Sequence, residues 1–226
     1  MKILPCLALA GLLFTSTTTA YSQENKEEER VVSSIDVLKE FTTMKESIPS
    51  QLLKTTEGII IIPGMKNAGF VVGGKRGKGI AIIKNDDGTW SNPVFITLTG
   101  GSFGLQVGYQ SVDLVLVFKK KKTLENIDEG DFTLGGDISA AAGPVGRSST
   151  ASTDYKLEAE VYSYSKAKGL FAGVSLNGSV LEVDAKSNEN YYGEDVSAES
   201  IFKNEVKDEN DETATLKQTL RSVASK

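Results

Sequence analysis

The 226-residue chain contains no histidine, one cysteine and one tryptophan. Histidine is the usual general base near neutral pH and the commonest metal ligand. The single cysteine, Cys6, lies in an N-terminal apolar run that we expect to be removed. The remaining chain then has no thiol for a disulfide, for nucleophilic catalysis or for a metal. These absences argue against an enzyme, and the sequence predicts neither a cofactor nor a metal site.

The sequence also has no apolar run of the roughly 20 residues that a membrane-spanning helix needs. Its longest run, Ile3–Phe14, follows a positive start and leads into small polar residues that end at Ala20. This order is typical of a secretory signal. We therefore expect residues 1–22 to be a signal peptide, cleaved after Ala20 or Ser22. The mature protein is predicted to be exported, periplasmic or extracellular, and peripheral to a membrane.

No central segment has an excess of either charge, although the whole chain has a net charge of −5. Residues 31–188 contain 17 basic and 17 acidic side chains, so the negative charge belongs to the two ends. Acidic ends are typical of solvated tails, and the lack of a basic excess argues against a nucleic-acid partner. We predict an acidic linker at residues 23–33, one domain at residues 34–195 and an acidic, partly helical tail at residues 196–226.

Helical periodicity begins at Ser33. Apolar residues then recur at steps of three and four, which predicts one apolar helix face. Such a face packs against a core in most proteins, but it can also insert into a membrane surface. In the tail, two weaker helices are expected at Ala198–Lys203 and Thr213–Val223. The apolar positions of the first helix are Ile35, Leu38, Phe41, Met44 and Ile48.

Between Gly58 and Asp184 the chain consists of β-prone runs and glycine-rich turns. Asp87-Gly88 and Asn177-Gly178 each separate two such runs, which predicts two hairpins. A first strand is expected to end at Pro63. A later one, with alternating Phe103, Leu105, Val107 and Tyr109, should have one buried face. The predicted fold class is α+β, mainly β: a glycine-rich antiparallel curved sheet or barrel-like core with an N-terminal helix and a short helical C-terminal tail.

Two cationic stretches are candidates for binding anions. Gly73–Gly79 contains Lys75, Arg76 and Lys78 but lacks the spacing and the strand–loop–helix context of a phosphate-binding P-loop. It is expected to be a turn that either holds an anion or is simply solvated. Lys119–Lys122, which comprises Lys119, Lys120, Lys121 and Lys122, closes an apolar strand. Each of these lysines would contribute about 1 kcal/mol at an anionic membrane, or they are a solvated strand end that discourages aggregation.

Several of these segments resemble the SYLF family, and they occur in the family's order over about residues 35–195. The resemblance implies a non-catalytic module that binds phospholipid headgroups, which are phosphoinositides in eukaryotic members, some of which also bind actin. Arg147, beside a Gly-Pro-Val-Gly turn, is the basic residue of these motifs that is most suited to a bidentate phosphate contact. It could equally bond loop carbonyls. The matching segments are Lys66–Gly74, Gly88–Pro93, Phe103–Gly108, Ala142–Arg147, Tyr162–Lys166 and Lys168–Ser175.

The sequence thus predicts an exported binding module for anionic phospholipid at a membrane surface. The alternative is a structural or protein-interaction module of the cell envelope. Actin is not an expected partner of an exported chain. The residues predicted to contact headgroups are Lys75, Arg76, Lys78, Lys119, Lys120, Lys121, Lys122 and Arg147.

Overall fold

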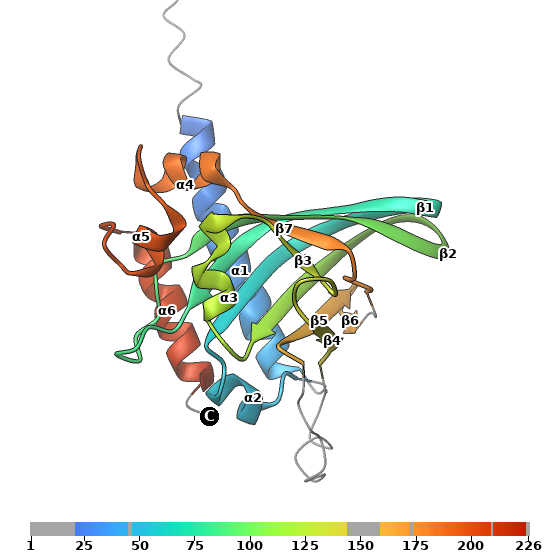
Figure 1. Ribbon diagram of the computed structural model, residues 1–226, viewed down its shortest axis with the longest axis horizontal. Helices are drawn as coiled ribbons and strands as arrows, with labels where there is room; N and C mark the ends of the chain where they lie inside the picture. Colours follow the sequence, from blue (N-terminus) through green and yellow to red (C-terminus); the bar gives the residue numbers. More distant parts are fainter. Residues whose placement is uncertain (1–20, 45–46, 144–158, 172–173, 209, 225–226) are drawn as a thin grey trace, which may run out of the picture.

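A computed structural model describes residues 21–44, 47–143, 159–171, 174–208 and 210–224. It confirms the predicted fold class, since a seven-stranded, barrel-like sheet is flanked by an N-terminal and a C-terminal helix (Figure 1). The elements in chain order are α1 (Tyr21–Thr43), α2 (Ser50–Lys54), β1 (Gly58–Ile83), β2 (Val94–Phe118), α3 (Lys122–Glu125), the 3-10 helix η1 (Ile127–Glu129), β3 (Phe132–Leu134), β4 (Ala140–Ala142), β5 (Val161–Ala167), β6 (Leu170–Phe171), β7 (Ser179–Val183), α4 (Ala185–Tyr192), α5 (Ala198–Phe202) and α6 (Asp211–Ala224).

The long strands β1 and β2 form one antiparallel ribbon that folds back on itself (Figure 1). The two ends of β1 meet where the backbone N–H of Lys84 donates to the carbonyl of Glu57 at 2.8 Å. Glycine makes this close approach sterically possible. A Cβ added at Gly79 would lie 2.2 Å from the carbonyl oxygen of Ile61. This distance is too short for any side chain, so only glycine fits there. The turn between the strands contains the predicted Asp87-Gly88, with Gly88 at φ +80°.

The other strands extend this ribbon along the free side of β2. β7 pairs with the first part of β2 and β5 with its last part, both antiparallel. β3 adds to β7, while β4 and β6 add to β5. The hairpin predicted around Asn177-Gly178 is wrong in its pairing, because the turn forms but β7 joins β2 and β3 instead of the segment before it.

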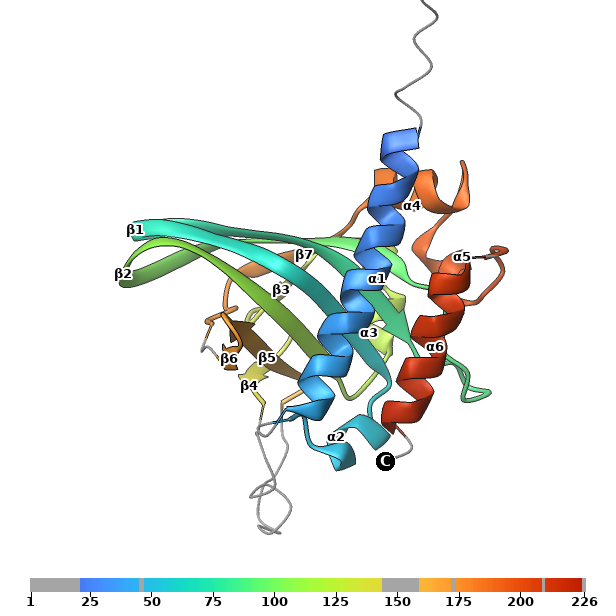
Figure 2. The same ribbon diagram turned by 180° about the vertical axis from the view of Figure 1, so that it is seen from behind.

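Near the helices the ribbon is buried on both of its faces, as the uninterrupted apolar runs at the ends of both strands require. Alternate residues of Ile59–Ile62 contribute to opposite cores. We call the face with Ile59 and Ile61 the outer face; it packs under α1, α2 and α6 (Figure 2). The inner face, with Ile60 and Ile62, is covered by α3, η1, β3 and α5.

Two predicted strand boundaries are wrong. Pro63 does not end its strand, because Pro63 and Gly64 form a bulge between Ile62 and Met65 and the pairing with β2 then resumes. A bulge tolerates proline because one residue there leaves the ladder. Likewise Gly73–Gly79 is not a turn but the continuation of β1, paired residue by residue with β2.

Both ends of the chain contribute more to the domain than the sequence predicted. α1 begins at Tyr21, so the segment predicted as an acidic linker is helical, and Glu27 in it is buried. The predicted apolar face is confirmed, since Ile35, Leu38 and Phe41 lie in the core. The expected tail helix is also present as α6 and packs beside α1 (Figure 2). No helix in the described part of the chain is long and apolar enough to span a bilayer. Residues 1–20 of the expected signal peptide lie outside the described residues.

Candidate functional site

The cations of Gly73–Gly79 are divided between the two faces of β1. Successive strand residues point to opposite sides, so Lys75 projects inward while Arg76 and Lys78 project outward. Lys75 is buried and its ammonium group donates to the carbonyl of Ser175, and burial lowers its pKa. Lys75 therefore holds an inner loop in place, whereas Arg76 and Lys78 are exposed at the surface.

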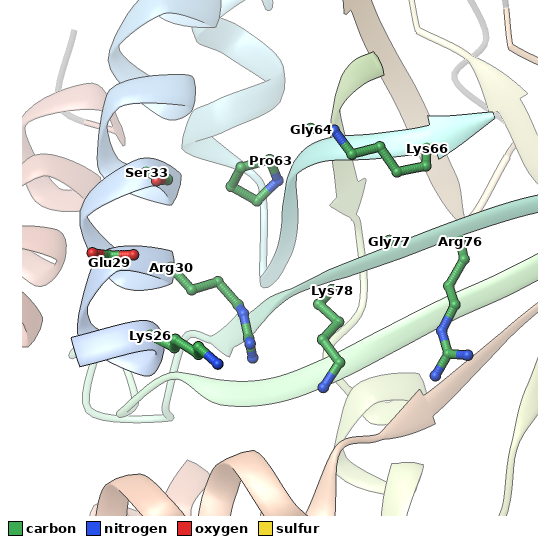
Figure 3. Close-up of a pocket in the computed structure, with 10 residues that line it drawn as sticks. All are labelled: Lys26, Glu29, Arg30, Ser33, Pro63, Gly64, Lys66, Arg76, Gly77 and Lys78. Carbon is green, nitrogen blue, oxygen red and sulfur yellow. The ribbon is translucent and has the colours of Figure 1, made fainter. Parts of the chain in front are cut away.

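The outer face of the ribbon changes character along its length. Where α1, α2 and α6 cover it, its side chains are apolar. Beyond the edge of α1 it carries cations, and a pocket of about 490 Å³ opens between α1 and the two diverging halves of β1 (Figure 3). The residues that line this pocket, the α1–β1 pocket, are Lys26, Glu29, Arg30, Ser33, Pro63, Gly64, Lys66, Arg76, Gly77 and Lys78.

An acidic residue at the rim holds two of these cations. Lys78 pairs with Asp184 at 2.6 Å, and the Arg30 guanidinium lies 3.8 Å from the same carboxylate. Asp184 also caps α4 by accepting from the backbone N–H of Ser187. Burial alone would raise the pKa of Asp184, but the hydrogen bonds from Lys78 and Ser187 outweigh it and the pKa is lowered. Asp184 is therefore a resident anion beside the pocket.

The remaining cations are not neutralised in this way. Lys26 and Arg76 are exposed, and neither forms an ion pair with a described residue. Lys66 is also exposed, donates weakly to Ser111 at 3.4 Å and places its ammonium group 5.6 Å from the centre of the Tyr109 ring. The sequence predicted Tyr109 on a buried strand face, yet 67% of it is exposed because no helix covers this part of the ribbon.

The pocket therefore has a surplus of positive charge. Five cations line the pocket beside the carboxylate of Glu29, Asp184 pairs with two of them, and Glu27 attracts Arg30. These three carboxylates leave a formal excess of 5 − 3 = 2 positive charges. Arg30 is additionally fixed over the Phe95 ring, 5.3 Å from its centre, and by a 3.2 Å hydrogen bond to Ser187. A preformed cluster of lysine and arginine in a concave site suits a phosphate-bearing anion.

Sequence reasoning found only two of the five cations, Arg76 and Lys78. Lys66 stands in the first of the SYLF-like motifs, which is a signal that could have identified it. Lys26 and Arg30 lie in the acidic segment before the predicted domain, where the local sequence suggested only a solvated tail. The packing of α1 across the sheet brings them to the pocket, and no local pattern shows that contact.

The other predicted cations do not join this site. Lys119–Lys122 follows the end of β2, about 17 Å along the ribbon from Pro63 at 3.3–3.4 Å per strand residue. There Lys121 pairs with Asp86 at 2.6 Å and with Glu125 at 3.2 Å, which raises its pKa. Lys120 and Lys122 are exposed. Arg147 lies outside the described residues. Among the residues that are described, no three acidic, cysteine or histidine side chains group as metal ligands do.

The fold and the pocket define a mainly-β domain with a cationic concave surface. A family model described as "Ysc84: Las17-binding protein actin regulator" matches residues 99–223, more than half of the chain. The chain therefore belongs to the Ysc84 family, which confirms the resemblance to SYLF proteins. The match ends at Val223, so it covers α5 and α6, which lie in the segment that the sequence predicted as a tail.

Several curated proteins are similar over most of this chain. LAS seventeen-binding protein 3 of Saccharomyces cerevisiae is 34% identical over 81% of the chain and 40% of its own length. Protein YSC84 of the same species is 37% identical over 71% of the chain and 35% of its length. SH3 domain-containing YSC84-like protein 1 of Homo sapiens is 34% identical over 74% of the chain and 50% of its length. The chain thus spans about half or less of the length of these relatives, the first of which is named as a binding protein.

Proposed function

We propose that this protein is an exported, non-catalytic module that binds anionic phospholipid headgroups at a membrane surface through the α1–β1 pocket. The observation that carries the proposal is the gathering of five cations on one face, three of which form no ion pair with a described residue. Each cation near an anionic membrane contributes about 1 kcal/mol. The export part of the proposal rests on the sequence pattern of residues 1–22.

The pocket predicts which charges matter for binding to vesicles. We expect Arg76→Gln combined with Lys78→Gln to weaken binding to phosphatidylcholine vesicles containing phosphatidylglycerol by roughly tenfold or more, because two cations worth about 1 kcal/mol each are lost. Co-sedimentation at low salt measures the change. A matched control is Lys54→Gln combined with Lys203→Gln, which removes the same charge from exposed positions outside the pocket.

Three results of this experiment contradict parts of the proposal. No binding of the unchanged protein to anionic vesicles excludes lipid binding as its function. Equal losses in the two double variants show that net charge, and not the pocket, governs binding. If Lys120→Gln weakens binding as strongly as Arg76→Gln, the Lys119–Lys122 cluster also contacts the membrane and the pocket is not the whole site.

A protein partner is the second candidate function, and the family description favours it because it names a Las17-binding actin regulator. The sequence predicted no actin partner because of the expected export, but the family description makes an actin-regulatory partner a candidate again. An interaction module of the cell envelope is the corresponding role for an exported chain. A pull-down that captures a protein in the absence of any vesicle binding favours this second candidate.

A further inference from the structure

One exposed aromatic side chain lies next to the cationic pocket. Where the structure describes the exposure of side chains, the large hydrophobic residues that are exposed are Val32, Tyr109 and Leu170. Tyr109 belongs to β2, where it pairs with Ala68, close to the bulge at which the β1–β2 ribbon bends back on itself. Its ring is the one that Lys66 approaches to 5.6 Å, and Lys66 lines the pocket. Tyr109 is therefore joined to the pocket by a direct contact.

The strand register places Tyr109 on the same face as the pocket. Lys66 pairs with Ser111, and the diagonal contact from Lys66 to Tyr109 requires both side chains to project to one side of the sheet. That side is the outer face, because Val115 and Val117, further along β2 at the same parity, pack under the helices. Tyr109 thus continues the outer face beyond the cover that α1 provides.

Leu170 is more exposed but projects to the opposite face. It pairs with Ala167, whose side chain belongs to the inner core, and paired residues project to the same side. Lys166, one residue earlier, projects to the outer face, where it pairs with Glu40 of α1. Of these two strand residues, Tyr109 is therefore exposed on the cationic face and Leu170 on the other face.

We propose that Tyr109 is a membrane anchor that enters the interface between lipid headgroups and acyl chains while the adjacent cations hold the headgroups. Tyrosine favours this depth because its ring is apolar and its hydroxyl remains hydrated. The partner is an anionic bilayer, since the cationic pocket opens on the same face and Lys66 of its lining contacts the ring. The inference rests on the proposed function and adds the orientation of the protein on the membrane.

A tryptophan at this position reports its own depth. In Tyr109→Trp, the new side chain should be quenched by phosphatidylcholine brominated on its acyl chains, in vesicles that also contain phosphatidylglycerol. The natural Trp90 is buried under the helices and should be insensitive to the bromines, so the unsubstituted protein is the control. Vesicle binding without extra quenching in Tyr109→Trp overturns the anchor and leaves the proposed function intact. Absence of vesicle binding overturns both.

Two serine variants test the energetic part of the inference. Tyr109→Ser should weaken binding to the same vesicles about tenfold at physiological salt, which corresponds to roughly 60 Å² of apolar ring surface leaving water. Leu170→Ser removes a comparably exposed residue from the opposite face and should leave binding unchanged. Equal affinities of Tyr109→Ser and the unsubstituted protein, or a larger loss in Leu170→Ser, contradict this orientation. Circular dichroism of both variants confirms that the fold is retained.

Discussion

At the scale of single residues, Asp184 limits the attraction of the pocket for anions. Its carboxylate lies 2.6 Å from Lys78 and competes with any phosphate for that ammonium group. Asp184→Asn should therefore strengthen binding to anionic vesicles several-fold at low salt, an effect of the size expected for one charge near the surface. Asparagine is as good an N-cap as aspartate, so α4 should remain. Vesicle titration measures the affinity, and an unchanged or weaker affinity contradicts this role.

The same residue predicts a dependence of stability on pH. The pKa of Asp184 is lowered in the folded protein from its ordinary value of 3.8. A carboxyl with a depressed pKa stabilises the fold above its unfolded pKa, and this contribution is lost as the pH falls through the folded pKa. Acidification from pH 5 to pH 2 should thus destabilise the natural protein more than Asp184→Asn. Urea unfolding at both pH values measures the difference, and parallel losses contradict it.

At the scale of elements, the sequence predicted helical periodicity and the hairpin at Asp87-Gly88, but not the other strand pairings. Ile35, Leu38 and Phe41 mark the buried face of α1 correctly, and Leu216 and Leu220 mark that of α6. Gly73–Gly79 is different, because glycine and charge disfavour an isolated strand. Here β2 supplies a partner along the whole segment. The low strand propensity of this segment is therefore outweighed by its pairing with β2, which forms only in the folded ribbon.

The site follows the same rule. Arg76 and Lys78 were found as a cluster along the sequence, but Lys75 beside them turns inward, because neighbours in a strand face opposite ways. Once that segment is known to be a strand, the division follows from its sequence alone. The contribution of α1 does not, because Lys26 and Arg30 are about 40 to 50 positions away from the strand residues that they meet. Because Gly73–Gly79 was predicted as a turn, the sequence did not show which of its cations share a face.

At the scale of the whole molecule, helices from both ends of the chain share one core over the outer face of the sheet. Val31 of α1, Leu216 and Leu220 of α6 and Trp90 of the β1–β2 turn all belong to it. The inner core lies on the other face of the same strands. Neither core can separate from the sheet without exposing the other, so the protein should unfold as one cooperative unit.

Leu220→Ala tests whether the protein unfolds as one cooperative unit. Leu220 is only 1% exposed, although it lies in the segment that the sequence predicted as a tail. Removing its buried methyl groups should destabilise the protein by about 2–5 kcal/mol, whereas Gln218→Ala on the exposed side of α6 should have little effect. Far-UV circular dichroism follows the helices and strands during urea unfolding. Trp90 fluorescence follows the β1–β2 turn, in which Trp90 lies. In Leu220→Ala both midpoints should move down together. If the dichroism moves while Trp90 keeps its natural midpoint, α6 is a separable appendage, and the outer core is not continuous from the C-terminal helix to the β1–β2 turn.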